Sequence, residues 1–363
     1  MRPDVQGSFI SSSSFIFIAG VFGSCAKKSL ETETDAAQAG GNGTSADAVV
    51  IGSLEVDAWS HERNYTIQSD GSWSVESSRF ITCEPSVGTG DTEVKLYVQD
   101  NLSGVRKDGK ITIVSPGAQN RVVAVEQLCA DDYTEEELGA HPIGTSNKIY
   151  AVGYSYDARD EYASPNSVRL EVFDTRRLIK SGILAKNATD LSLHNMTLTG
   201  STISEIRDTL SSQVNGKASW GLFAAEMNTS FNMGYAKSDN YEYAVSYVDL
   251  KVYNISLEKD LETIKDRYMM DDAYNAINGI PVRRRSGRME AAYPTDAEGI
   301  KRLVRDYGTH VVMNAGLGGR VRYSMSVNIS NITTNYDAGA FIKASYGDVS
   351  SMGVSAEVRN CNS

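Results

Sequence analysis

Residues 305–319 read Arg-Asp-Tyr-Gly-Thr-His-Val-Val-Met-Asn-Ala-Gly-Leu-Gly-Gly and join a predicted helix to a predicted strand. The helix is expected to begin at Thr295, because Glu298 three residues later completes the spacing of a capping box. It is expected to end at Gly308, since glycine commonly occupies the left-handed position that stops a helix. Apolar residues recur at helical spacing between these ends, at Ile300, Leu303, Val304 and Tyr307.

The strand that follows carries a pair of glycines. Residues 311–325 are rich in strand formers, and a glycine inside a strand commonly marks a bend or bulge. Together with the element made of Tyr307, Gly308, Thr309 and His310, the pair Gly318 and Gly319 resembles the signature of the membrane attack complex/perforin (MACPF) family. The resemblance implies a bent antiparallel sheet in which the two glycines are the hinge. Most members of that family make pores by unfolding helices into membrane-spanning hairpins.

Residues 131–363 as a whole resemble the MACPF domain. Residues 149–157 alternate, and they are similar to the glycine- and tyrosine-rich first strand of bacterial members. Helices are predicted near residues 203–210 and over residues 257–278, where Gly279 would stop the second one. Long strands with separate helices indicate an α+β domain, a MACPF-like bent sheet with flanking helices. Thr309 and His310 could hydrogen-bond across the bend and hold the convertible segments in register.

Residues 222–235 have the pattern of a strand that could enter a membrane. A tilted membrane strand needs about 9–11 residues. Because lipid tolerates only helices or closed barrels, insertion would require a ring of many copies. The same alternation fits a half-buried strand over the domain's own core, so both interpretations stay open. The apolar face would carry Phe223, Ala225, Met227, Phe231, Met233 and Tyr235.

A second convertible segment is expected at residues 330–357, where small and apolar residues alternate and glycines recur. The family pattern continues beyond this segment into a last core strand. The sequence is therefore expected to be a fragment of a longer protein or the product of a truncated gene, with the MACPF-like domain incomplete at its C-terminus. An unpaired sheet edge would be an aggregation risk.

The N-terminus has the features of an export signal. Residues 9–24 are apolar and rich in serine, and they end in small residues before Cys25. This resembles a bacterial lipoprotein signal over residues 1–25, with Cys25 as the lipidation site. A plain cleaved signal peptide and a misassigned start remain alternatives. Residues 26–47 are predicted to be a flexible linker. We expect an exported protein, anchored at the outer membrane or cell surface, or secreted.

Residues 48–129 predict a second, all-β domain. Short alternating runs separated by glycine-containing turns indicate an immunoglobulin-like sandwich. The order of its strands and turns resembles the BACON domain, found in exported bacterial proteins, so carbohydrate is a candidate ligand of this sandwich. Trp73 could stack on a sugar, although a strand tryptophan in a small sandwich is more often part of the core. The sandwich could also be only a spacer.

The remaining cysteines and histidines indicate no metal site and no cofactor. Cys83 and Cys129 could form a disulfide, because both would lie in the sandwich, and Cys361 would stay unpaired. The four histidines are scattered and no CxxC spacing occurs. We assign no catalytic residue and expect no enzyme, because no nucleophile or elbow motif accompanies His310.

Composition restricts the partners. The net charge is −11 and the pI is near 5.0. Phosphate binding needs a basic face, so nucleic acid is not an expected partner. The basic run Arg283, Arg284, Arg285 and Arg288 is either a solvated loop or a contact for lipid headgroups or another subunit.

Two classes of function remain. The first is a surface-anchored or secreted pore-forming protein that assembles into a ring and inserts into a target membrane, through lipid or a surface receptor, as an antibacterial toxin. The second is a non-lytic surface lipoprotein for adhesion or glycan binding, or an inactive truncated product. Fold alone does not decide between them.

Overall fold

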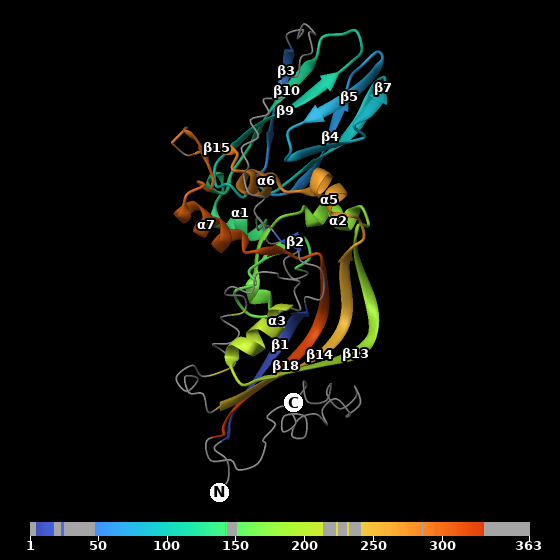
Figure 1. The fold of residues 1–363 in the computed structure, drawn as a ribbon. Coiled ribbons are helices and arrows are strands. Elements are labelled where there is room, and N and C mark those ends of the chain that lie inside the picture. The colour runs from blue at the N-terminus through green and yellow to red at the C-terminus, as the bar shows by residue number, and fades with distance from the viewer. Residues whose placement is uncertain are drawn as a thin grey trace.

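The computed structural model describes residues 5–17, 23–24, 48–141, 143, 151–212, 223, 231, 241–284 and 286–329. A β-sandwich forms one end of the molecule and a long bent sheet forms the other, with most of the helices between them (Figure 1). The mixed α+β class predicted from the sequence is confirmed.

The N-terminal sandwich consists of two packed sheets. One sheet has the strand order β3 (Val49–Val56), β10 (Arg121–Gln127), β9 (Lys107–Val114), β5 (Ser72–Ser77) and β7 (Val87–Thr89). The other has the order β4 (His61–Ile67), β8 (Thr92–Val98) and β6 (Ile81–Glu84). Trp73 is buried between the sheets and its indole Nε1 donates to the Gly90 carbonyl over 3.0 Å. It is a core residue, which removes the sugar-stacking alternative.

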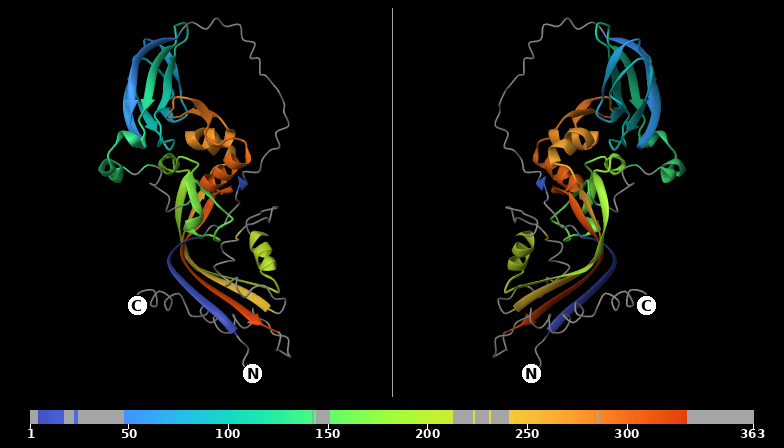
Figure 2. Two further views of the ribbon diagram at one scale, coloured as in Figure 1. Left: turned by 90° about the vertical axis from the view of Figure 1, so that its left-hand side faces the viewer. Right: turned by 90° about the vertical axis from the view of Figure 1, so that its right-hand side faces the viewer.

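The C-terminal half is built on a four-stranded antiparallel sheet. Its order is β1 (Val5–Phe17), β18 (Asn314–Asn328), β14 (Tyr241–Leu257) and β13 (Leu184–Gly200). The two views in Figure 2 show that this sheet curves strongly, with α3 (Ile203–Ser212) against the concave side. Ile206 and Leu210 of α3 are fully buried there.

One line of irregular pairing crosses the bent sheet. The register shifts once between each pair of neighbouring strands, at Ser12/Phe15, at Lys251/Tyr253 and at Ala188/Ser192. Lys251 pairs with both Ser192 and Gly318, and Gly318 pairs with Phe15, so the three shifts lie side by side. We call this the bend line. The predicted bulge at the double glycine is therefore confirmed, and it extends across all four strands.

Residues 5–17, which the sequence assigns to an export signal, form β1 at the outer edge of β18. Residues 23–24 form the short strand β2, paired with β17. The edge of β18, where a last core strand was expected to be missing, thus has a strand beside it. The signal peptide, the lipidation of Cys25 and the linker over residues 26–47 stay predictions, and Cys25 and that linker lie outside the described residues.

Smaller elements join the two ends of the molecule. A short sheet has the order β12 (Val168–Glu171), β11 (Tyr154–Tyr156), β17 (His310–Val311) and β2 (Gly23–Ser24), and β15 (Pro281–Arg283) forms a hairpin with β16 (Met289–Ala291). The other helices among the described residues are α1 (Glu135–Ala140), α2 (Thr175–Lys180), α5 (Leu261–Tyr268), α6 (Asp271–Asn278) and α7 (Ala297–Tyr307), with 3-10 turns at Ala130–Asp132 and Pro165–Ser167. None of the described helices is both long enough and apolar enough to cross a membrane.

Two helix predictions need correction. The helix expected over residues 257–278 is two helices, α5 and α6. The break falls where Met269 bridges to Phe173 and the Met270 amide donates to the Val172 carbonyl, so these two residues are extended and cannot be helical. Helix α7 is capped by Asp296 rather than Thr295, because the Asp296 carboxylate accepts from the Gly299 amide.

Candidate functional site

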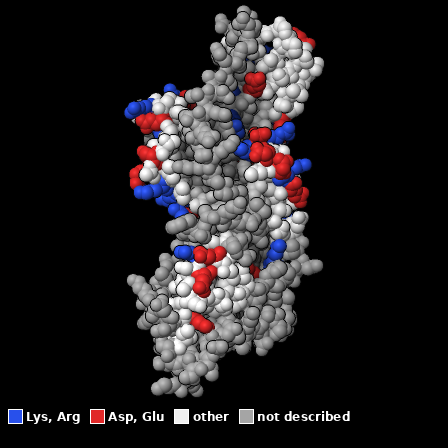
Figure 3. Space-filling model, viewed as in Figure 1, with Lys and Arg blue, Asp and Glu red and all other residues white. Residues whose placement is uncertain are grey.

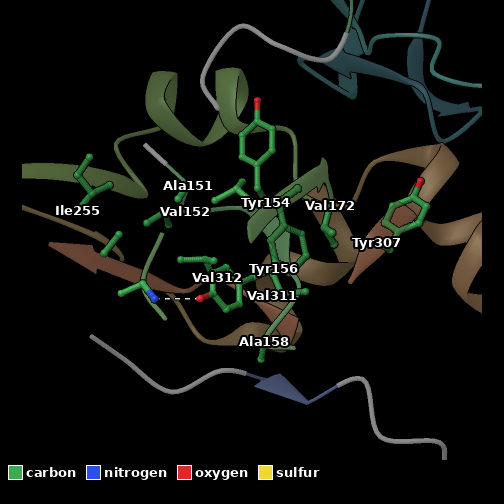
Figure 4. Close-up of a cluster of buried hydrophobic side chains, with 14 of the residues drawn as sticks. Ala151, Val152, Tyr154, Tyr156, Ala158, Val172, Ile255, Tyr307, Val311 and Val312 are labelled. Atoms are coloured by element: carbon green, nitrogen blue, oxygen red, sulfur yellow. Dashed lines mark hydrogen bonds between the residues drawn. The ribbon is translucent and has the colours of Figure 1, made fainter. Parts of the chain in front are cut away.

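The family signature fastens the end of α7 to strand β11. Gly308 has φ of +63°, and a Cβ there would lie 2.5 Å from the Tyr156 carbonyl carbon and oxygen. Glycine is therefore required both for this turn and for the close approach of the two backbones. The Thr309 amide donates to the Tyr156 carbonyl over 2.9 Å, and the Thr309 hydroxyl accepts from the Ala158 amide over 3.1 Å. Figure 4 shows how Tyr154, Tyr156, Val311 and Val312 meet in the core beside this turn.

His310 is a structural residue of this turn. It is buried, pairs with Tyr156 across β11 and β17, and its Nδ1 lies 2.7 Å from the Thr309 hydroxyl. Burial lowers the pKa of His310, an effect that the nearby Asp157 carboxylate only partly opposes, so the imidazole is neutral at pH 7. Thr309 and His310 were expected to bond across the bend. The bonds of Thr309 run to Tyr156 of β11 and to Ala158 instead, and His310 pairs with Tyr156 across β17 and β11.

The two glycines predicted to be the hinge lie on the bend line but have different surroundings. A Cβ on Gly318 would lie 1.7 Å from the Leu250 carbonyl oxygen, so no side chain fits there. A Cβ on Gly319 would meet nothing within 4 Å. Neither glycine has a positive φ. Gly318 is therefore needed for close packing of β18 on β14, whereas Gly319 is free to carry a side chain.

Arg320, which directly follows the glycines, connects the sheet to the loop that contains Tyr162. Its guanidinium binds the Asp249 carboxylate of β14 at two points, over 2.7 and 3.0 Å, and donates to the Tyr162 carbonyl over 2.8 Å. It also lies 5.0 Å from the ring centres of Tyr162 and Tyr247. Its side chain is only 9% exposed and that of Asp249 only 15%. We call Arg320, Asp249 and the Tyr162 carbonyl the Arg320 clamp.

Tyr162 also contacts Phe223, a residue of the predicted membrane-inserting segment. Phe223 is fully buried, its ring meets the Tyr162 ring edge-on at 5.3 Å, and its amide donates to the Ala158 carbonyl over 2.7 Å. Phe231 is also buried, with its ring 5.3 Å from that of Tyr243 in β14. These two residues pack on the domain's own core. Phe223 has φ of +53° and lies in a turn.

The other members of the predicted apolar face are Ala225, Met227, Met233 and Tyr235, and they lie outside the described residues, as does the second predicted segment beyond residue 329. The first segment lies between β13 and β14, which are neighbours in the sheet. A strand pair formed from it would extend the β13–β14 hairpin without changing the order of the strands.

Sequence reasoning missed the Arg320 clamp. Asp249 is a carboxylate between the apolar residues Val248 and Leu250 of β14, and Arg320 directly follows the double glycine. Burying a carboxylate in a sheet costs free energy unless an opposite charge binds it, so the position of Asp249 predicts a basic partner.

The predicted disulfide is not formed. Cys83 and Cys129 are both buried free thiols. The Cys83 Sγ approaches the Pro85 carbonyl, whereas Cys129 stands at the start of the 3-10 turn after β10, where its amide donates to Asp132. Burial raises the pKa of the Cys83 thiol to about 11, so it stays a neutral core residue.

The basic run is partly a structural element of the hairpin β15–β16. Arg283 pairs with Asp108 of the sandwich over 2.7 Å. Arg284 donates to the carbonyls of Ala291 and Ala292 and so closes the hairpin. Arg288 pairs with Glu290, and Arg285 lies outside the described residues.

Comparison with known proteins agrees with this site. Residues 188–363 match the MAC/Perforin domain family. None of the curated proteins matches the chain significantly. Structures with some similarity include GNIP1Aa from Chromobacterium piscinae, 17% identical with a TM-score of 0.44 over 56% of this chain and 38% of that one. A second is a putative cell invasion protein with a MAC/Perforin domain from Bacteroides thetaiotaomicron, 11% identical with a TM-score of 0.35 over 48% of this chain and 35% of that one. A third is a Bacteroides ovatus GH5 xyloglucanase in complex with a heptasaccharide, 16% identical with a TM-score of 0.21 over 33% of this chain and 28% of that one.

A bent four-stranded sheet, a glycine pair on its bend line and a signature turn together define a perforin-like domain. This class is assigned to residues 188–363, the part of the chain that matches the MAC/Perforin domain family. The chain spans 28% to 38% of the length of the structures to which it is similar.

Proposed function

We propose that the protein is a pore former in which the segment between β13 and β14 rearranges and extends the β13–β14 hairpin into a target membrane. The single observation that carries this proposal is the packing of Phe223 on the loop that the Arg320 clamp holds. Phe223 of this segment thus packs against a loop that is bonded to Arg320, next to the bend line. Insertion would require a ring of copies, because one chain cannot close a barrel.

The finer parts of the proposal concern where the protein acts. A surface-anchored or secreted protein of this family would meet the membranes of neighbouring cells, which fits use as an antibacterial toxin. The Cys25 lipid anchor and a carbohydrate or receptor partner belong to this proposal and rest on the sequence alone. A non-lytic surface lipoprotein is the competing function.

Replacing Met227 with Asp tests the inserting segment. A carboxylate on the lipid face of a membrane strand costs free energy in every copy of the ring, so we expect release of a dye from lipid vesicles to fall by about tenfold or more. The matched control is Asn228→Asp, which places the same charge on the polar face and should release dye like the parent protein.

Two results would contradict the proposal. Equal dye release from both variants would show that residues 222–235 do not enter the membrane. No release by the parent protein from vesicles made of lipids of its target cells would favour the non-lytic surface lipoprotein.

A further inference from the structure

The sandwich is docked firmly on the C-terminal half. Gln99, which is buried at the end of β8, donates from Nε2 to the Met269 carbonyl over 3.3 Å. Its Oε1 accepts from the Asp271 amide over 2.9 Å. The N-cap of α6, Met270, offers no side-chain acceptor, so the sandwich supplies the acceptor that the first turn of α6 lacks. A sandwich that caps a helix of its neighbour is more than a spacer.

Ion pairs surround this contact. Lys107 of β9 lies 2.8 Å from the Asp272 carboxylate and 3.3 Å from that of Asp271, and all three side chains are at least four-fifths buried. Asp272 also accepts from the Leu102 amide over 2.8 Å. Figure 3 shows acidic and basic side chains next to one another in the middle of the molecule, between the sandwich and the bent sheet.

Helix α2 forms the second half of the contact. Arg177 reaches the Thr82 hydroxyl over 2.9 Å and the Glu84 carboxylate over 3.3 Å, both in β6 of the sandwich. Lys180 pairs with Glu62, and Arg176 donates to the Ser60 carbonyl. We call the contacts that the sandwich makes with α2 and with residues 269–272 the joint.

Three buried carboxyl groups lie at the joint. Asp100 comes from the sandwich, Glu171 from the end of β12 and Asp174 from the N-cap of α2, and each is at most 5% exposed. Glu171 accepts from the amide and hydroxyl of Thr175, Asp174 from the Arg177 amide, and Asp100 from the Ser60 amide. No group of side chains among the described residues is arranged to hold a metal ion.

Burial, with the Asp174 and Asp100 carboxylates nearby, raises the pKa of Glu171 to about 8. Burial and Asp100 also raise the pKa of Asp174 to about 6, although Arg177 and Arg176 oppose this shift. Both groups therefore hold a proton more tightly when the joint is closed than they would in water.

We propose that the joint is a pH-responsive contact, closed while the buried Glu171 and Asp174 are protonated and loosened when these two groups ionise. The charged groups that face Glu171 and Asp174 are Asp100 from the sandwich and Arg176 and Arg177 from α2. Ionisation of Glu171 adds a negative charge to a site that already holds Asp174 and Asp100. Separation of the two halves relieves this repulsion by admitting water and removing Asp100.

The sign follows from the raised pKa values. A carboxyl group with a raised pKa contributes its full stabilisation below its usual pKa and loses it as the pH rises through the raised value. For Asp174 the loss extends from the usual 3.8 to about 6, and for Glu171 from 4.5 to about 8. The joint should therefore loosen between mildly acidic and mildly alkaline pH.

Hydrogen exchange of the full chain tests this, using the protection factors of the Leu102 and Asp271 amides at pH 6 and pH 9. The opening equilibrium of the parent protein should rise by up to about a hundredfold over this range. Glu171→Gln mimics the protonated form and keeps an acceptor for Thr175, so its opening should change little. Glu136→Gln, an exposed residue of α1, is the matched control and should behave like the parent.

A second variant, Asp100→Asn, tests the proposal independently in case Glu171→Gln does not fold. Asp100→Asn keeps an acceptor for the Ser60 amide and removes one charge that repels the ionised Glu171 and Asp174, so the rise in opening between pH 6 and pH 9 should be smaller than in the parent protein. The same pH dependence in the parent protein, Glu171→Gln and Asp100→Asn would overturn the proposal. None of these outcomes depends on whether the protein lyses membranes.

Discussion

Arg320→Leu is expected to lower the free energy of unfolding by about 3–5 kcal/mol, because it leaves the nearly buried Asp249 carboxylate without its guanidinium. The Tyr162 carbonyl loses a donor at the same time, so the loop that covers Phe223 is held less firmly. Thermal unfolding followed by circular dichroism measures the loss. A more exposed pair provides the control: Arg305→Leu removes the guanidinium beside Asp306, which keeps its bond from the Tyr293 hydroxyl, and should change stability by about 1 kcal/mol or less.

The double variant Arg320→Leu with Asp249→Leu separates stability from function. Replacing both partners of a buried ion pair by apolar residues removes the unpaired charge, so the double variant should regain most of the lost stability. It still lacks the bond to the Tyr162 carbonyl. If the clamp restrains the inserting segment, this variant should release vesicle dye sooner than the parent protein. An Arg320→Leu protein as stable as the parent would show that the clamp contributes nothing.

Gly318→Ala and Gly319→Ala should differ sharply although the two positions are adjacent. At Gly318 the added methyl group would lie 1.7 Å from the Leu250 carbonyl oxygen, a backbone atom that cannot rotate away. We expect a loss of about 3 kcal/mol or more in the free energy of unfolding, at the upper end for overpacked sites. At Gly319 nothing lies within 4 Å, so the change should be at most about 1 kcal/mol and could be stabilising.

Chemical denaturation of the two alanine variants, side by side, measures this difference. The pair is its own control, since the substitution, the strand and the neighbourhood are the same. Equal midpoints for the two variants would mean that β18 does not pack on β14 as closely at Gly318 as the structure has it.

Local signals explain which parts of the fold were predictable. Helix α7 and its stop at Gly308 follow from spacing within a dozen residues, and the strand with its glycine bulge follows directly after them. The sandwich was predictable because alternation in β8 buries Val94, Leu96 and Val98. The break between α5 and α6 was missed because it depends on Phe173 and Val172, almost a hundred residues upstream.

The same reasoning explains why most of the site could not be predicted. Arg320 is 71 residues from Asp249 and 158 from Tyr162, and Gln99 is 170 residues from Met269. No periodicity in a sequence reports contacts at such separations. The resemblance to a family pointed to the glycine pair and to the signature turn, because both are short continuous motifs. It could not show that Thr309 bonds to β11, which is a property of the folded chain.

The bend line has a mechanical consequence. Because the register shifts of all four strands fall side by side, the sheet is creased along one row of residues and regular on either side of it. Such a sheet does not flatten gradually along its length. Its two regular panels would turn as stiff plates about the crease, and the resistance would be concentrated in the few side chains that bridge it. Straightening would then be an all-or-none event in each molecule, with Arg320 one residue beyond the glycine pair on the crease.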